Sequence, residues 1–263
     1  MRILLTGSTG FLGRDILARL VGGGHTVYAL HRRTPPALGI PVTGDILAGD
    51  DLGIARVPKV DAVLHCAGRI DLSLRANREV WKTNVEGTWN VLGFCVKHGI
   101  ERLYYVGTAY TGNRNPYELS KAKAEEIVGA FARVHNLTFT IFKPSIIIGG
   151  FATERVPLEN AFVRVVAAIA RVHYRAEGAR RKVEETMRLP PLEPVLRIPG
   201  NPEGELNLVP VDWVASELSE RLDQEGQVYL VNPRPPTLAQ VSQWVGDVLR
   251  LTIRFMPKFT ATP

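Results

Sequence analysis

The sequence predicts an α/β fold: a doubly wound parallel sheet followed by a smaller C-terminal region. Short runs rich in β-branched and aromatic residues alternate with helical patterns through the first 145 residues. A glycine-rich loop joins the first of these runs to the first helix, and after residue 150 the alternation gives way to a basic helix and a proline-rich stretch. Strands that alternate with helices form βαβ units, which build parallel sheets.

The alternating part of the chain supplies the elements of this sheet. The expected strands are RILLT (2–6), HTVYAL (25–30), PVTGD (41–45), DAVLHCA (61–67), RLYYVGT (102–108) and TFTIFKPS (138–145). The expected helices cover residues 11–21, 77–99 and 115–136. The last of them has Pro116 at its start, where a missing N–H group costs nothing.

After residue 150 the regular alternation of strands and helices is expected to end. Residues 155–188 hold eight Lys/Arg and four Glu, and apolar residues recur there at helical spacing, which predicts a basic amphipathic helix over 158–182. We favour a lid helix with a solvated cationic face; the alternatives are a surface for a membrane or for an acidic carrier protein. The proline-rich stretch 189–204 should have little regular structure.

Further strands and helices are expected beyond the proline-rich stretch. They are a strand at 205–211, a helix at 212–222 capped by Asp212, a strand at 227–231 and a helix at 237–250 capped by Thr237. The expected domains are therefore residues 1–150 for dinucleotide binding, with 206–232 returning to them, and residues 151–205 with 233–263 for substrate binding.

Composition narrows the class of protein. With 263 residues, 45% hydrophobic and 22% charged, the chain resembles an ordinary soluble globular enzyme. Its net charge of +6 is too diffuse to indicate a nucleic-acid partner. Two cysteines and scattered histidines predict neither a metal site nor a disulfide framework. Because no signal peptide or long apolar run is recognised, we expect a cytoplasmic protein without a membrane span.

The glycine loop TGSTGFLG, residues 6–13, indicates a phosphate-binding turn. Glycine permits a tight turn and close approach of backbone N–H groups to a pyrophosphate, and the following helix presents the positive end of its dipole. The position of the loop, after a strand and before an amphipathic helix, is the context that the motif requires. The expected cofactor contacts in the loop are Gly7, Thr9, Gly10, Phe11, Leu12 and Gly13.

The end of the second strand bears on the choice of nicotinamide cofactor. An NAD site usually places an acid there to bind the ribose 2′-OH, whereas this chain reads LHRR, ending in Arg32 and Arg33. A guanidinium donates two parallel bonds to a phosphate, so NADP(H) is expected over NAD(H). Asp45, after the third strand, is expected either to accept a bond from the adenine amino group or to cap its own loop.

The segment YELSK, residues 117–121, places a phenol and an ammonium four positions apart. On a helix these positions share one face. A cation beside a phenol lowers the pKa of that phenol, so Tyr117 and Lys121 could together serve proton transfer near neutral pH.

Taken together, these segments resemble the extended short-chain dehydrogenase/reductase superfamily, with its Rossmann fold. TGSTGFLG is similar to its glycine loop, HCAG (65–68) to the turn after its fourth strand, NVEGTWNVL (84–92) to a characteristic helix, and YELSK to its Tyr-Lys pair. VGTAY, NPYELSKAKAE, IFKPSIIIG and LNLVPVDWVA further resemble the thioester reductase and fatty acyl reductase branch. That branch reduces acyl thioesters to aldehydes or alcohols with NADPH.

The resemblance implies roles for individual residues. Tyr117 would be the general acid, Lys121 would tune it and bind the nicotinamide ribose, and Thr108 would orient the substrate oxygen. Asn84 would support the lysine through a water. The remaining cofactor contacts would come from Ile46, Cys66, Ala67, Gly68 and Pro144.

The leading interpretation is thus an NADPH-dependent carbonyl reductase, with an acyl thioester or an aldehyde as substrate. Thr108 and Tyr117 are only nine residues apart, a shorter loop than is usual in the superfamily. A nucleotide-sugar epimerase or dehydratase with tightly held NAD, and a non-catalytic NADP-binding sensor or scaffold, remain alternatives. A homodimer through the tyrosine-bearing helix is a further expectation of the resemblance.

Overall fold

The computed structural model describes residues 1–71, 78–112, 114–150, 160–188 and 195–256. The chain divides into two compact units, Met1–Val156 with Val209–Val231, and Pro157–Leu208 with Asn232–Pro263. The division of roles expected between them, with the cofactor in one and the substrate in the other, stays a prediction. The first two residues of the expected helix 158–182 lie outside the described residues.

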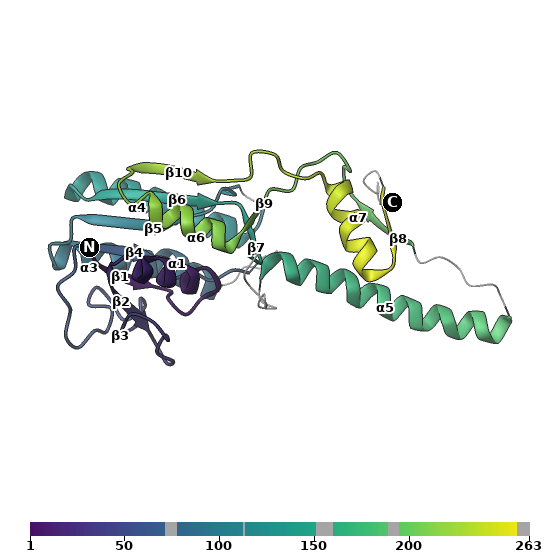
Figure 1. Ribbon diagram of the computed structural model, residues 1–263, viewed down its shortest axis with the longest axis horizontal. Coiled ribbons are helices and arrows are strands. Elements are labelled where there is room, and N and C mark those ends of the chain that lie inside the picture. Colours follow the sequence, from purple (N-terminus) through teal and green to yellow (C-terminus); the bar gives the residue numbers. More distant parts are fainter. Residues whose placement is uncertain (72–77, 113, 151–159, 189–194, 257–263) are drawn as a thin grey trace. The chain divides into compact units, whose positions relative to one another are not determined.

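The first unit is built on a seven-stranded sheet in the order β10-β6-β5-β4-β1-β2-β3 (Figure 1). Every neighbouring pair in it is parallel. The strand order reverses beside β1, so the predicted doubly wound parallel sheet is confirmed. The strands are β1 (Arg2–Thr6), β2 (Thr26–His31), β3 (Ile40–Thr43), β4 (Ala62–His65), β5 (Arg102–Val106), β6 (Thr138–Pro144) and β10 (Gly226–Leu230).

Helices cover both faces of this sheet. One face packs against α1 (Phe11–Gly22) and α6 (Val211–Glu220), and the other against α3 (Gly87–Lys97) and α4 (Pro116–His135). Successive residues of β1 alternate between the two cores, because Ile3 and Leu5 join the first and Leu4 joins the second. The inner strands β1, β4, β5 and β6 are buried on both faces, which explains their continuous hydrophobic runs, whereas the edge strands β3 and β10 are partly exposed.

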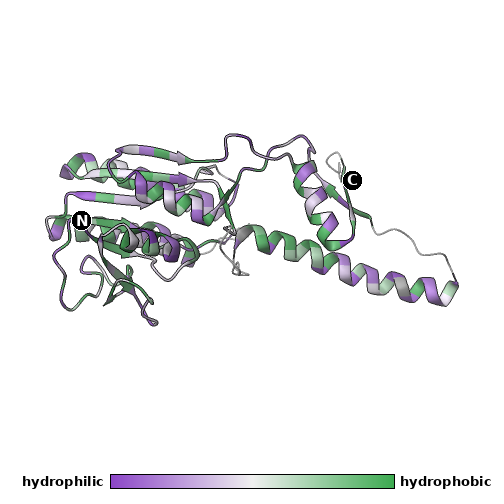
Figure 2. Cartoon of the chain, in the orientation of Figure 1, coloured by the Kyte–Doolittle hydropathy of each residue, from purple (hydrophilic) through white to green (hydrophobic). Residues whose placement is uncertain are grey.

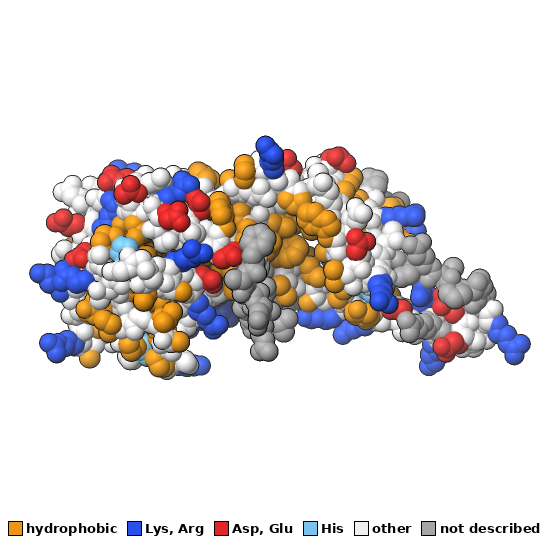
Figure 3. Space-filling view, in the orientation of Figure 1, with side chains coloured by type: hydrophobic (Ala, Val, Ile, Leu, Met, Phe, Trp, Pro, Cys, Tyr) orange, Lys and Arg blue, Asp and Glu red, His pale blue; other side chains and the backbone are white. Residues whose placement is uncertain are grey.

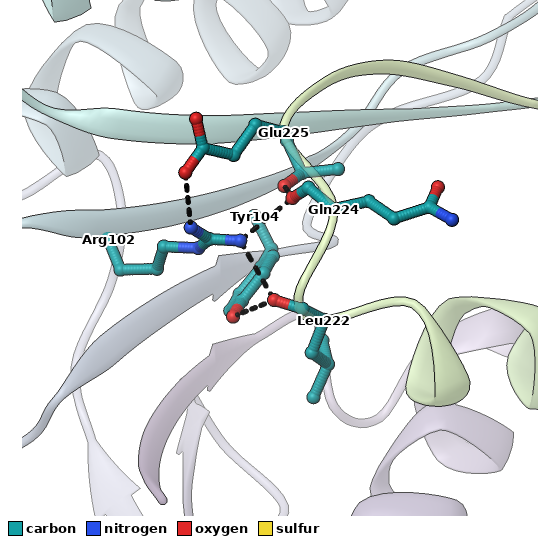
Figure 4. Close-up of polar contacts among 6 residues, drawn as sticks. Arg102, Tyr104, Leu222, Gln224 and Glu225 are labelled. Carbon is teal, nitrogen blue, oxygen red and sulfur yellow. Dashed lines mark hydrogen bonds and ion pairs between the residues drawn. The ribbon is translucent and has the colours of Figure 1, made fainter.

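A polar clamp attaches the returning segment to the sheet. After α6 the chain re-enters at β10, and the Arg102 guanidinium donates to the carbonyl oxygens of Leu222 (2.8 Å) and Gln224 (2.7 Å) (Figure 4). The Tyr104 hydroxyl donates to the same Leu222 carbonyl at 2.7 Å. These bonds satisfy carbonyl groups at the entry to β10, and β10 then pairs with β6.

The helix predicted over 77–99 is interrupted in its hydrogen bonding. Its described part contains α2 (Arg78–Trp81), a π-helical stretch η1 (Lys82–Glu86) and α3, which ends at Lys97. A π-bulge inserts one residue into a turn and is frequent at functional sites. Sequence periodicity did not reveal it, although Asn84, a predicted site residue, lies inside it.

The predicted cap of α6 is wrong. Pro210, in extended conformation, is the N-cap, and Asp212 lies within the first turn. The Asp212 carboxylate accepts from the Trp213 N–H at 3.0 Å, and a negative charge in this turn suits the helix dipole. Ahead of α6, β9 (Leu208–Pro210) pairs with β7 (Ile146–Ile148) outside the main sheet.

The second unit contains α5 (Ala161–Met187), β8 (Val195–Pro199), α7 (Leu238–Leu249) and β11 (Thr252–Met256). The expectation of little regular structure over 189–204 is wrong for β8, which pairs in parallel with β11. Neither strand was foreseen, because their pairing joins segments far apart in the chain. The predicted Thr237 cap of α7 is confirmed, with a reciprocal capping box to Gln240.

Candidate active site

The predicted site segments follow the carboxyl ends of neighbouring parallel strands in the first unit. The glycine loop follows β1, Arg32 follows β2, the 66–68 turn follows β4, Thr108 follows β5, and Pro144 ends β6. Carboxyl ends of parallel strands meet at one edge of a sheet, where ligands bind in open α/β folds. The structure therefore brings these segments to a common edge.

The glycine loop forms a cradle that only glycine can build. Gly7 has φ +73°, and a Cβ there would lie 2.6 Å from the Ala67 nitrogen. A Cβ on Gly13 would lie 2.0 Å from the Gly7 carbonyl oxygen. Gly10 is the N-cap of α1, and no acidic side chain lies in the first helical turn. The backbone N–H groups of this first turn have no partner within the helix, and together with the glycine loop they suit the binding of a phosphate.

Of the two arginines that follow β2, Arg32 lies beside Asp45. A guanidinium nitrogen of Arg32 is 3.8 Å from a carboxylate oxygen of Asp45, whereas Arg33 is exposed and has no ion pair within the described chain. The other Asp45 oxygen accepts from the Leu47 N–H at 3.0 Å, which is the loop-capping role that the sequence left open. Ile46 packs against Gly87 of α3, where an added Cβ would lie 2.7 Å from its Cδ1.

Tyr117 and Lys121 lie on the first turns of α4. Burial raises the pKa of the Tyr117 phenol above its usual value, and the Lys121 charge acts against this in the expected direction. Burial also lowers the pKa of Lys121, opposed by Tyr117 and Glu125. A phenol with a raised pKa is protonated near neutral pH and can donate a proton.

The Lys121 ammonium is held by strand β5. Its Nζ donates to the Tyr105 hydroxyl and to the Val106 carbonyl oxygen, each at 2.7 Å. Its Nζ also lies 4.3 Å from the centre of the Tyr105 ring. Lys121 itself is 5% exposed, so these contacts replace water for a buried charge. Sequence reasoning did not single out Tyr105.

Thr108 is positioned by a buried ion pair that the sequence did not indicate. Glu125 lies one turn beyond Lys121, and one of its carboxylate oxygens accepts from the Thr108 backbone N–H at 3.1 Å. Its other oxygen accepts from the Lys143 ammonium at 2.7 Å, with side-chain exposures of 8% and 6%. The Thr108 hydroxyl accepts from the Tyr110 N–H at 3.2 Å. The only sequence signal for Glu125 is its four-residue spacing after Tyr117 and Lys121.

A buried network ties the end of β4 to the glycine loop. His65 Nδ1 lies 2.7 Å from the Thr6 hydroxyl and His65 Nε2 lies 3.1 Å from the Thr88 hydroxyl. Thr88 donates its proton to the Asn84 carbonyl, so Nε2 is the protonated nitrogen and Nδ1 accepts from Thr6. Burial, aided by the Lys121 charge, lowers the pKa of His65 to about 3, which keeps the imidazole neutral and structural.

Asn84 links the turn after β4 to the helix that carries Tyr117. Its amide accepts from the Arg69 N–H at 2.8 Å and donates to the Ser120 hydroxyl at 2.9 Å. Ser120 in turn donates to the Tyr117 carbonyl at 2.7 Å. The expected water between Asn84 and Lys121 stays a prediction. In the adjacent turn, burial raises the pKa of the Cys66 thiol to about 12, so this thiol is neutral.

The short connection between Thr108 and Tyr117 is gathered around Glu118. Asn115 caps α4 by accepting from the Glu118 N–H at 2.9 Å. The Glu118 carboxylate pairs with Arg114 at 3.0 Å and is 8% exposed. This carboxylate thereby holds the described part of the loop beside the helix start.

The described residues show neither a metal-binding cluster nor a membrane-spanning helix. They contain no cluster of three or more His, Cys, Asp or Glu that could hold a metal ion. Among the same residues, no helix is both long and apolar enough to pass through a lipid bilayer.

Comparison with known families gives one match over most of the chain. Residues 3–182 match the model of the NAD dependent epimerase/dehydratase family. The matched range includes every predicted site residue from Gly7 to Pro144.

Among curated proteins, the 2-alkyl-3-oxoalkanoate reductase of Stenotrophomonas maltophilia (strain K279a) is 35% identical over 130 residues, which cover 48% of this chain and 39% of the reductase. The 3-beta-hydroxysteroid dehydrogenase of Mycolicibacterium neoaurum is 32% identical over 117 residues, covering 41% and 32%. The chain thus spans less than half the length of these relatives.

Among solved structures, the terminal R domain of the myxalamid PKS-NRPS pathway superimposes with a TM-score of 0.72 at 23% identity, covering 97% of this chain and 72% of that one. UDP-glucose 4-epimerase of Thermus thermophilus, in complex with NAD, gives a TM-score of 0.66 at 20% identity, covering 98% and 86%. At these identities the similarity establishes a shared fold.

Proposed function

Because the chain belongs to the NAD dependent epimerase/dehydratase family, a branch of the extended short-chain dehydrogenase/reductase superfamily, we propose that it is an NADPH-dependent reductase of a carbonyl substrate. The substrate class is an acyl thioester or an aldehyde. The observation that carries this proposal is the buried Lys121 on the same helix face as Tyr117, held by Tyr105 and Val106 at the carboxyl edge of the sheet.

The residues present fit a nicotinamide dinucleotide. A Cβ at Gly7 or Gly13 would collide with backbone atoms of the loop itself or of the turn after β4, so the tight turn that lets backbone N–H groups approach a pyrophosphate needs both glycines. Two buried polar atoms at strand ends, His31 Nδ1 and Ser145 Oγ, have no hydrogen-bond partner within the described chain. The glycine loop would hold the pyrophosphate, and Lys121 the nicotinamide ribose. The cofactor, when bound, supplies a hydride.

The chain's own groups then handle the oxygen of the substrate. The Thr108 hydroxyl orients the carbonyl oxygen, and the Tyr117 hydroxyl gives it a proton as the carbonyl carbon is reduced. The raised pKa of Tyr117 favours this direction, since the phenol arrives protonated. With a thioester substrate the product of this step is a hemithioacetal, whose C–S bond breaks as the hydroxyl proton passes to sulfur, so that a thiol departs and an aldehyde remains. An aldehyde substrate becomes an alcohol.

The first test is NADPH consumption with a panel of acyl thioesters, aldehydes and ketones. Substrate-dependent oxidation of NADPH supports the proposal. If NADPH binds and no member of the panel is reduced, the non-catalytic sensor interpretation takes its place.

Cofactor preference gives a separate prediction. Arg32 and Arg33 are proposed to bind the 2′-phosphate, so replacing both by alanine should weaken NADPH binding by about 1.5–3 kcal/mol for each charge-assisted bond lost. NADH binding should hardly change. Fluorescence titration with both cofactors measures this. Arg56→Ala, an exposed arginine outside the proposed cofactor contacts, is the control, and equal wild-type affinity for NADPH and NADH contradicts the assignment.

A second candidate function follows from the family name and from the superimposed UDP-glucose 4-epimerase. A nucleotide-sugar epimerase would retain NAD through purification and would interconvert UDP-sugars without net NADPH consumption. Release of NAD from the denatured protein, together with epimer formation, would favour this function over the reductase.

We further propose a homodimer through the outer face of α3 and α4. Trp89 (54% exposed) and Val134 (75% exposed) lie on this face, and Trp89 meets Phe131 edge-on at 5.5 Å between ring centres. Exposed apolar patches of this kind mark interaction surfaces. We expect Trp89→Glu to convert a dimer to a monomer in sedimentation velocity and Trp244→Glu, at an equally exposed position of α7, to leave it unchanged. A wild-type monomer contradicts the proposal.

A further inference from the structure

The basic helix α5 carries a row of cations that the proposed reaction does not use. The row consists of Arg164, Arg171, Arg175 and Lys182, all exposed. At 3.6 residues per turn these positions fall within about 40° of one another, and they extend over about 27 Å of helix. The four cations therefore form one straight line along a single face.

Within the described chain, none of these four cations forms an ion pair with a carboxylate of the helix itself. The described carboxylate contacts of α5 lie on the opposite side, between the His173 imidazole and Glu177 (3.6 Å) and between Arg180 and Glu184 (3.3 Å). The side chains of those pairs are only 7–24% exposed, whereas no member of the cation row has an ion pair within the described chain. The less exposed carboxylates Glu177 and Glu184 thus have partners on their own face, and the four cations of the outer row have no ion pair within the described chain.

Apolar side chains border the row along one edge. Val165 is 52% exposed, Val172 is 55% exposed and Met187 is 64% exposed. Figure 2 shows hydrophobic residues predominating in the N-terminal half of α5, and in Figure 3 Lys and Arg side chains protrude along the lower border of the region that this helix occupies. Cations beside exposed apolar residues are typical of a helix that lies on a lipid surface.

We propose that this face of α5 binds the surface of a bilayer that contains anionic phospholipids. A flat anionic surface contacts a straight cation row along its whole length, and guanidinium groups suit phosphate oxygens. An acidic protein is the less fitting partner, because protein interfaces depend on large buried anchors near their centre. Here the line of the row holds only cations and, beside them, the small residues Ala168 and Gly178, while the exposed Val172 and Tyr174 flank it.

The test is co-sedimentation of the protein with vesicles of phosphatidylcholine alone and of phosphatidylcholine mixed with phosphatidylglycerol. We expect binding only to the mixed vesicles, and weaker binding as salt is raised. Changing all four cations to glutamine (R164Q/R171Q/R175Q/K182Q) should weaken binding about 10²–10³-fold, since each basic residue near an anionic surface contributes several-fold. The matched control R56Q/K59Q/R234Q/R254Q removes four exposed cations elsewhere and should bind like the wild type.

Three results would overturn the proposal. They are no binding to the mixed vesicles, equal binding to both vesicle types, and equal weakening by the two quadruple variants. Retention on polyglutamate resin without vesicle binding would assign the surface to an acidic protein instead. Circular dichroism and NADPH affinity, compared among all variants, show that the folds are intact.

Discussion

Replacing Tyr117 by phenylalanine is expected to slow hydride transfer by roughly 10²–10⁴-fold, the usual contribution of a positioned acid. The fold and NADPH binding should be nearly unchanged, because one hydroxyl is lost. In the protein this hydroxyl has a raised pKa, through burial set against the Lys121 charge. In the proposed mechanism, its loss removes the proton that would neutralise the developing alkoxide. Single-turnover stopped-flow measurement of NADPH absorbance gives the rate of this step.

The matched control for Tyr117→Phe is Tyr229→Phe, which removes a phenol hydroxyl from an exposed position on β10 and should leave the rate unaltered. Lys121→Met extends the test. It should impair catalysis and cofactor binding together. Combined with Tyr117→Phe, it should raise the activation free energy by less than the sum of the two single increases, because both groups are proposed to act on one proton transfer. A wild-type rate for Tyr117→Phe would make this tyrosine structural.

Glu125→Gln is expected to lower the free energy of unfolding by about 3–5 kcal/mol. Glu125 and Lys143 form an ion pair of 2.7 Å with both side chains below 10% exposure. Removing the carboxylate charge leaves the Lys143 ammonium buried without a counter-charge, and weakens the acceptor that holds the Thr108 N–H. Urea unfolding followed by circular dichroism measures the loss.

The same helix offers a control for this prediction. Glu126 pairs with Lys123 at 2.9 Å, but the two side chains are 68% and 43% exposed, so Glu126→Gln should cost at most about 1 kcal/mol. Adding Lys143→Met to Glu125→Gln should recover part of the stability, since the uncompensated charge is then absent. If Glu125→Gln and Glu126→Gln lowered the free energy of unfolding equally, burial of the Glu125–Lys143 pair would not be the cause of the loss.

The parts of the fold that the sequence predicted depend on local signals. The glycine loop needs the conformational freedom of Gly7 and the close approach at Gly13, and both requirements appear as glycines at fixed spacing. The inner strands of the main sheet are buried on both faces, so they appear as short continuous apolar runs. The Thr237 cap was predictable because its partner Gln240 lies three residues away.

The parts that the sequence did not predict depend on contacts between distant segments. Tyr105 on β5 accepts a hydrogen bond from the Lys121 ammonium of α4. Lys143 on β6 donates to the Glu125 carboxylate of α4. Nothing adjacent to any of these residues signals its partner. The same holds for β8 and β11, whose pairing joins Val195 to Thr252, 57 positions later in the chain. The π-helical turn around Asn84 lies inside a stretch that the sequence predicted as one continuous helix.

The most direct test of the central claim, that this chain reduces a carbonyl with a nicotinamide hydride, follows the hydride itself. The protein is incubated with a carbonyl substrate identified by the panel and with NADPH deuterated at both C4 positions, and the product is analysed by mass spectrometry. The account predicts one deuterium on the former carbonyl carbon for each NADPH consumed, and very slow transfer with Tyr117→Phe. Product without deuterium, or a UDP-sugar epimer formed on retained NAD without NADPH consumption, would contradict it.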